Sequence, residues 1–125
     1  MIDNNLIQFW ISELAKLQGI SMGADELVDD VVLTAYVFDD PKTFSIVMTN
    51  VVNAFQLIVQ QPTIGQALVG GKSGWNSFHF QSQRTQKHDA DMRMVYRHTG
   101  HTILIMGFGH RFLPNDFYQR LKNRE

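Results

Sequence analysis

Apolar residues recur at helical spacing in two stretches of the amino-terminal half. From Leu6 to Leu17 they return every three or four positions until Gly19, which predicts an amphipathic amino-terminal helix. A second stripe runs from Phe44 to Val59. Asp40 and Pro41 precede it, and an aspartate cap followed by proline at the first helical position is typical of a helix start. The sequence therefore predicts a long helix there.

The segments around these helices show other patterns. Val31–Phe38 is apolar at nearly every position, as in a strand covered on both faces, and we expect the first strand there. Ile20–Asp30 holds one glycine and four acids without a period and is expected to be a connector. The short apolar segment in Thr63–Gly71 is expected to form a short helix.

Alternating positions in the carboxyl-terminal half predict three further strands: Trp75–Gln81, Met92–Arg97 and Thr102–Phe108. Thr99-Gly100 suits a tight hairpin turn between the last two. Pro114–Leu121 is expected to form a closing helix. The predicted fold class is α+β, with a twisted antiparallel sheet of about four strands packed on helices and an additional amino-terminal helix.

Composition supports a folded globular chain, because 44% of its 125 residues are hydrophobic and 18% are charged. The absence of cysteine excludes disulfides, thiolate metal sites and cysteine nucleophiles. The apolar run Val31–Phe38 is far shorter than the roughly 20 residues of a membrane helix, and no cationic segment opens the chain. We expect a cytoplasmic protein with no membrane association.

Charge divides the chain into two unlike halves. Residues 1–71 carry eight acids and two bases, a net charge of −6, whereas residues 72–125 carry nine bases and four acids, a net charge of +5. All five histidines lie in the basic half. This asymmetry indicates that one face of the fold meets an anion.

Two arginines and two histidines are the first candidates for chemistry. Arg93 begins one predicted strand and Arg111 leaves the next, so a hairpin brings both to a site where they could stabilise a phosphorane-like transition state. His79 and His110 could supply the base and the acid that RNA cleavage by its own 2′-hydroxyl requires. Tyr118 could stack on a base or share a proton. Solvated arginines, packed histidines and a core tyrosine are the structural alternatives.

Metal and cofactor binding are not expected. His98 and His101 flank the hairpin turn, but no acid or third histidine keeps ligand spacing with them.

The order of these segments resembles the RelE/ParE superfamily of small bacterial toxins from toxin–antitoxin modules. The resemblance rests on the strand and long helix, on Pro62-Thr63-Ile64-Gly65, on Arg93-Met94-Val95-Tyr96, and on the run from Ile103 to Arg111 ahead of Tyr118. It divides the chain into an amino-terminal helical extension with its connector, 1–30, and a toxin-like domain, 31–125.

For the RelE-like branch, the resemblance implies metal-independent cleavage of messenger RNA in the ribosomal A site. By position, Arg93, Arg111 and Tyr118 match family residues, and His79 stands where a polar residue faces the cleft. The expected partners are mRNA, the ribosome and a cognate antitoxin. The bases expected to contact RNA are Lys72, Arg84, Lys87 and Arg97.

Two alternatives stay open. ParE-like relatives share the fold but poison DNA gyrase. A non-catalytic module whose groove binds an antitoxin or peptide would also suit the acidic front half. Independently, we expect the apolar stripe of the first helix to pack on the outside of the domain or on a second copy, which would form a homodimer.

Overall fold

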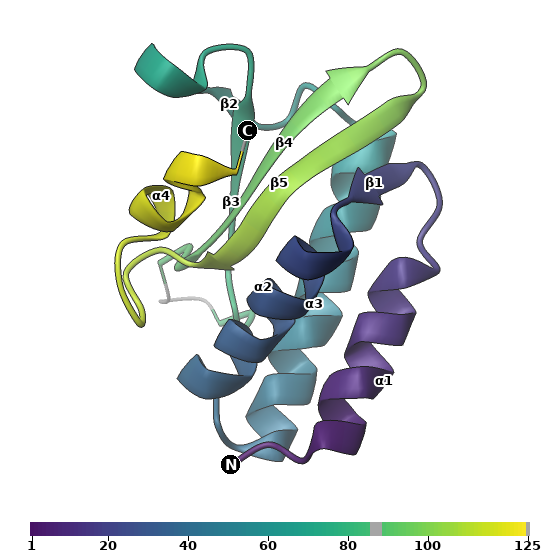
Figure 1. Ribbon diagram of the computed structural model, residues 1–125, viewed down its shortest axis with the longest axis vertical. Helices are drawn as coiled ribbons and strands as arrows, with labels where there is room; N and C mark the ends of the chain where they lie inside the picture. Colours follow the sequence, from purple (N-terminus) through teal and green to yellow (C-terminus); the bar gives the residue numbers. More distant parts are fainter. Residues whose placement is uncertain (86–88, 125) are drawn as a thin grey trace.

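The chain forms an α+β fold in this computed structural model, which describes residues 1–85 and 89–124 (Figure 1). Within these residues, four α-helices pack with one mixed sheet of five strands. The helices are α1 (Asn4–Ala15), α2 (Ala24–Val37), α3 (Pro41–Gln60) and α4 (Phe117–Arg120), with the short 3-10 helices η1 (Gly70–Lys72) and η2 (Leu121–Asn123). The strands are β1 (Ile20–Met22), β2 (Gln66–Ala67), β3 (Asn76–Phe80), β4 (Met92–Thr99) and β5 (Thr102–His110).

The sheet has the strand order β1-β5-β4-β3-β2. The predicted antiparallel meander of β3, β4 and β5 is confirmed, and the β4–β5 turn contains Gly100 with a φ of 56°. The expectation of about four strands, all antiparallel, is wrong in detail. Two short strands extend the sheet, and β1 pairs with β5 in parallel through Ile20↔Ile103.

The strand predicted at Val31–Phe38 is wrong, because residues up to Val37 continue α2. Asp30, Val31, Thr34 and Ala35 are buried at helical spacing, whereas the opposite side of the helix is exposed. The apolar run therefore reflects a helix with apolar residues on both its inner and outer sides, not a strand buried on both faces.

Two neighbouring expectations also change. The predicted connector contains β1 and the first turns of α2. The predicted short helix within Thr63–Gly71 is replaced by β2, after which η1 begins at Gly70. Gln66 and Ala67 are exposed and pair with Ser77 and Asn76, so backbone pairing accounts for this segment better than core packing does.

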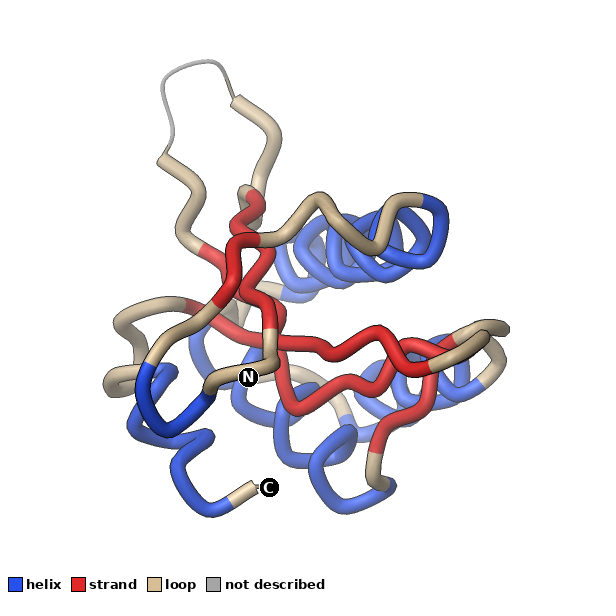
Figure 2. The backbone as a smooth tube through the Cα atoms, turned by 90° about the horizontal axis from the view of Figure 1, so that it is seen from above, coloured by secondary structure: helices blue, strands red, loops and turns tan. Residues whose placement is uncertain are grey.

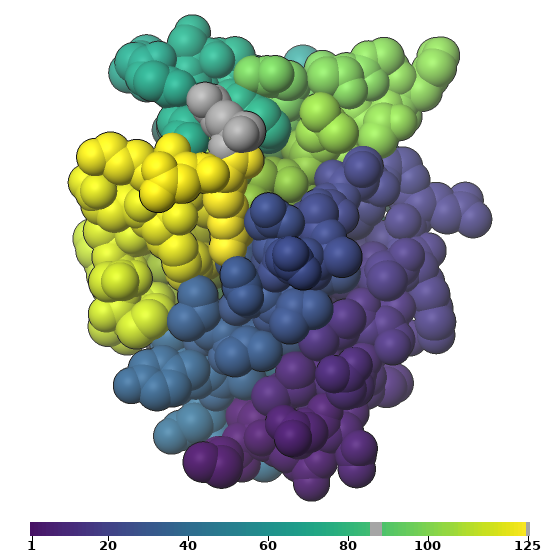
Figure 3. All heavy atoms as spheres, in the orientation of Figure 1, coloured from purple at the N-terminus to yellow at the C-terminus, as the bar shows by residue number. Residues whose placement is uncertain are grey.

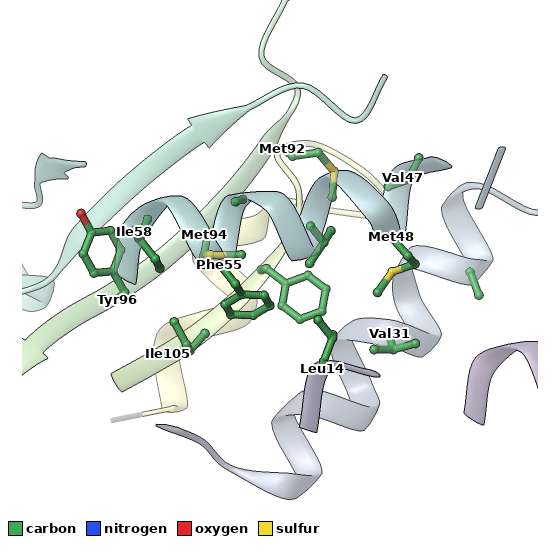
Figure 4. Close-up of a cluster of buried hydrophobic side chains, with 14 of the residues drawn as sticks. Leu14, Val31, Val47, Met48, Phe55, Ile58, Met92, Met94, Tyr96 and Ile105 are labelled. Atoms are coloured by element: carbon green, nitrogen blue, oxygen red, sulfur yellow. The ribbon is translucent and has the colours of Figure 1, made fainter. Parts of the chain in front are cut away.

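Helix α3 is the central helix of the main core, as its stripe predicted. The side chain of Asp40 accepts a hydrogen bond of 3.0 Å from the Thr43 amide, and Pro41 is the first helical residue. Figure 4 shows Phe55 of α3 beside Met94 and Ile105 of the sheet. The buried residues of α3 are Phe44, Val47, Met48, Val51, Ala54, Phe55 and Ile58.

Helix α3 is also long and apolar enough to cross a membrane, unlike the shorter run Val31–Phe38. Its apolar side is packed in the core, as in the central helix of a water-soluble protein.

Helix α1 packs on the core of its own chain. Leu14 is buried, and Leu6, Trp10 and Leu17 pack against the main cluster. This agrees with the first of the two expected positions for the amino-terminal stripe, on the domain itself.

A second, smaller cluster of buried side chains lies on the other face of the sheet, beneath α4 and η2. Figure 2 shows the carboxyl-terminal helical turns beside the sheet. Phe117 and Leu121 from the carboxyl-terminal segment pack there on Val95 and Met106. Alternation along β4 separates the two faces, since Met94 belongs to the main core and Val95 to the smaller cluster. The face beneath α4 therefore presents the odd-numbered residues of β3 and of the first half of β4.

Candidate functional site

His79 and Arg93 are direct cross-strand neighbours on the face beneath α4. His79 pairs with Arg93 in the β3–β4 register, and Arg93 pairs with Gly109 of β5. Residues directly opposite one another in antiparallel strands project their side chains to the same face. Because Gly109 has no side chain, the guanidinium of Arg120 fits against it on this face, where an added Cβ would lie 2.6 Å from Arg120 Nη2.

Tyr118 of α4 reaches the same face. Its hydroxyl oxygen lies 2.8 Å from Ser77 Oγ, two residues before His79 on β3. Arg111 follows β5, and its guanidinium carbon lies 4.8 Å from the centre of the Tyr118 ring. Arg111 also forms an ion pair with Asp116. The tyrosine ring thus connects Arg111 to the strand that carries His79.

The positive charges of Arg93 and Arg111 both affect the ionisation of His79. The pKa of His79 is lowered from 6.5 by partial burial and by the positive charges of Arg93 and Arg111. A lowered pKa keeps the imidazole neutral at pH 7 and able to accept a proton. The structure therefore brings together four of the five predicted site residues: His79, Arg93, Arg111 and Tyr118.

Arg93 is anchored by the backbone. Its Nη1 donates to the carbonyl oxygens of Ala90, at 2.6 Å, and Met92, at 3.0 Å. Its Nε is buried and has no hydrogen-bond partner among the described residues. These contacts fix the guanidinium near the start of β4, which is the preorganisation that an anion-stabilising group needs.

His110 does not join this group. It pairs with Met92 of β4, so it faces the main core, and its ring lies 6.1 Å from the Phe38 ring. Its Nδ1 accepts hydrogen bonds of 3.0 Å from the amides of Phe112 and Leu113. His110 thus organises the loop after β5, and the structure does not place it opposite His79.

Three of the predicted RNA-binding bases are among the described residues, and each contacts another part of the chain. Lys72 donates from Nζ to the Leu121 carbonyl oxygen at 2.9 Å, and the Arg97 guanidinium lies 4.4 Å from the centre of the Trp75 ring. Arg84 lines a separate hollow with Phe80. The fourth base, Lys87, lies outside the described residues.

A buried ionic cluster, which the sequence did not reveal, lies at the edge of β5 next to the site. Asp30 of α2 is fully buried and accepts from both nitrogens of Arg124 and from Arg120, at 2.9 to 3.2 Å. The amide of Phe108 also donates to Asp30, at 2.9 Å. Burial raises the pKa of the Asp30 carboxyl, and the two arginines oppose that rise.

The same cluster covers the β5 edge beyond β1. Arg120 donates to the Phe108 carbonyl oxygen and Arg124 to that of Met106. Gly107 and Gly109 allow this approach, because an added Cβ would lie 2.6 Å from Arg124 Nη1 or from Arg120 Nη2. The signal in the sequence was an aspartate directly before the apolar run Val31–Phe38, but only the helix and its neighbours identify the partners of this carboxylate.

No cluster of three or more histidine, aspartate or glutamate side chains suited to a metal ion occurs among residues 1–85 and 89–124.

Comparisons with protein families, with curated proteins and with solved structures find no match to this chain.

Proposed function

We propose that the chain is the toxin of a toxin–antitoxin module, with a RelE-like fold, and that it cleaves mRNA on the ribosome in the bacterial cytoplasm without a metal. The supporting observation is the convergence of His79, Arg93, Arg111 and Tyr118 on one face of the sheet. Each residue belongs to a different element or strand end, so the grouping depends on the fold. A cognate antitoxin would hold this activity in check.

In the proposed reaction, the neutral His79 imidazole accepts the proton of a ribose 2′-hydroxyl. The 2′ oxygen forms a bond to phosphorus while the bond from phosphorus to the 5′ oxygen breaks. Arg93 and Arg111 stabilise the negative charge that gathers on the non-bridging oxygens. The departing 5′ oxygen takes a proton from the Tyr118 hydroxyl, and the products are a 2′,3′-cyclic phosphate and a 5′-hydroxyl.

The ion pair between Arg111 and Asp116 adds a specific requirement. A phosphate that binds Arg111 must compete with the Asp116 carboxylate. Asp116→Asn should therefore strengthen RNA binding, whereas Arg111→Ala should weaken it. Opposite effects from two neighbouring residues would locate the phosphate at Arg111.

The test is RNA cleavage by the purified chain in the presence of ribosomes. Arg93→Ala or Arg111→Ala should lower the cleavage rate by about 10²–10³-fold, the usual effect of losing one preorganised contact to a developing negative charge. The thermal transition should change little. Lys42→Ala is the matched control, because that exposed base lies at the start of α3, which packs on the opposite face of the sheet. Tyr118→Phe keeps the ring and removes the proton, so it separates stacking from proton transfer.

Wild-type chain that cleaves no RNA with or without ribosomes, and that does not slow growth when expressed, would rule out the nuclease. Growth arrest with intact mRNA and trapped gyrase cleavage complexes would select the ParE-like alternative.

One observation favours the non-catalytic alternative. Arg111 is paired with Asp116, and Arg93 is bonded to backbone oxygens, so both already have structural partners. In a binding module these contacts would be their whole role. Arg93→Ala would then lower the free energy of unfolding and leave no activity to lose.

A further inference from the structure

The exposed side of α2 carries an apolar stripe. Val28, Val32 and Tyr36 follow one another at intervals of four residues, and all three are exposed, Tyr36 by 72%. Figure 3 shows α2 at the surface with no other segment over it. Single exposed apolar residues are ordinary in soluble proteins, but an aligned set is typical of an interaction surface.

The stripe borders an apolar hollow of about 680 Å³. Val32 and Tyr36 belong to both, and the loop after β5 closes the opposite side with Leu113 and Pro114. Leu113 is itself half-exposed. The stripe and the hollow thus form one continuous groove, here called the α2 groove, and its remaining lining residues are Met1, Ile2, Ile7, Ala35, Val37 and Asp39.

The charges around the α2 groove are acidic. Asp25 and Asp29 lie on the exposed side of α2 next to the stripe, and Asp39 lines the hollow. Among residues 1–85 and 89–124, no lysine or arginine lines the hollow, and the Met1 ammonium there donates to the Asp39 carbonyl oxygen at 3.3 Å. Charge complementarity therefore selects a cationic partner and disfavours an anionic membrane surface.

We propose that the α2 groove binds a basic amphipathic helix of a partner protein. Apolar residues at intervals of three and four along that helix contact Val28, Val32 and Tyr36. Its flanking lysines or arginines face Asp25 and Asp29. The inference does not depend on RNA cleavage, because the groove lies on the helical side of the molecule and His79 and Arg93 lie on the sheet face beneath α4.

The experiment uses the full chain and two synthetic helical peptides of about 18 residues, long enough to be helical in the groove. Both peptides carry the same leucine face, one with flanking lysines and the other with flanking glutamates. Fluorescence anisotropy should show the lysine peptide binding at least about tenfold more tightly, with the advantage lost near 0.5 M salt.

Variants locate the binding surface. The double variant Val32→Ser/Tyr36→Ser should weaken binding of the lysine peptide by about tenfold or more. Val69→Ser should leave it unchanged, because Val69 is 88% exposed but lies next to η1, away from the groove. Asp29→Lys should weaken binding of the lysine peptide and strengthen that of the glutamate peptide. Val32, Tyr36 and Val69 are exposed, so the thermal transition of these variants should stay in place. Asp29 also attracts Arg120 and Arg124, so Asp29→Lys should lower the transition temperature without unfolding the chain.

Three results would overturn the proposal. The first is equal affinity for both peptides, or no affinity for either. The second is a dimer in sedimentation analysis that Val32→Ser/Tyr36→Ser dissociates, because the occupant is then a second copy. The third is binding to phosphatidylserine vesicles that the same double variant abolishes, which assigns the groove to a membrane.

Discussion

Arg124 binds Asp30 through two hydrogen bonds of 2.9 Å, one from each terminal nitrogen of its guanidinium. This two-point contact joins residues 94 positions apart and fastens the end of the chain to α2. Figure 3 shows the carboxyl-terminal segment packed against that helix. The same segment carries Tyr118. The Asp30–Arg124 contact therefore holds α4, with Tyr118, against the sheet.

Asp30→Asn tests that contact. It keeps the size of the side chain but leaves Arg120 and Arg124 without their buried counter-charge, so the free energy of unfolding should fall by about 3–5 kcal/mol. Chemical denaturation measures the change. Asp25→Asn removes an exposed carboxylate from the first turn of the same helix and should shift stability by no more than about 1 kcal/mol. Equal effects of the two substitutions would mean that the buried cluster contributes nothing specific.

The pKa of His79 tests the convergence of the arginines. NMR titration should place it below 6.5. Arg93→Gln should raise the pKa, though not fully, because burial is the larger cause. Arg97→Gln, four residues further along the same strand, should leave it unchanged. If Arg93→Gln does not move the pKa, the two side chains do not share the site.

The same shift predicts a pH dependence of stability. Between the lowered pKa and 6.5, the unfolded chain binds a proton at His79 that the folded chain does not. His79 therefore makes the chain less stable as the pH falls through this interval. His79→Gln should reduce the loss of stability on acidification, measured as denaturation midpoints across the interval. An unchanged pH profile would show that His79 titrates alike in both states.

Phe55→Ala tests the main core. Phe55 is 1% exposed, and its ring meets that of Phe108 edge-on with centres 5.7 Å apart. The substitution should lower the free energy of unfolding by about 3–5 kcal/mol. Val59→Ala, at the exposed edge of the same helix, should have a much smaller effect. Comparable losses would contradict the burial of this face of α3.

Leu14→Ala tests the attachment of α1. Leu14 is buried against the rest of the core, so its truncation should cost about 2–5 kcal/mol of stability. Ser12→Ala, at an exposed position of α1, should be nearly neutral. A chain whose stability is unaffected by Leu14→Ala would have an α1 that does not support the domain.

Local signals in the sequence were enough for the elements that carry their own pattern. Asp40, Pro41 and the stripe from Phe44 onward specify α3. The capping residue, the first helical residue and the buried side chains all belong to one continuous segment of the sequence. The alternation of β3 and β4 also separated His79 and Arg93 from Phe78 and Met94, so the two-faced sheet followed from the sequence.

The tertiary structure alone decided what depends on partners distant in the chain. A run such as Val31–Val37 suits a buried strand or a helix. As a helix it buries Val31, Thr34 and Ala35 on one side, the side on which Asp30 meets Arg120 and Arg124. Strand β1 is too short for any alternation and exists because β5 offers an edge for pairing. The separation of His110 from His79 follows from the register of β5, which no local pattern determines.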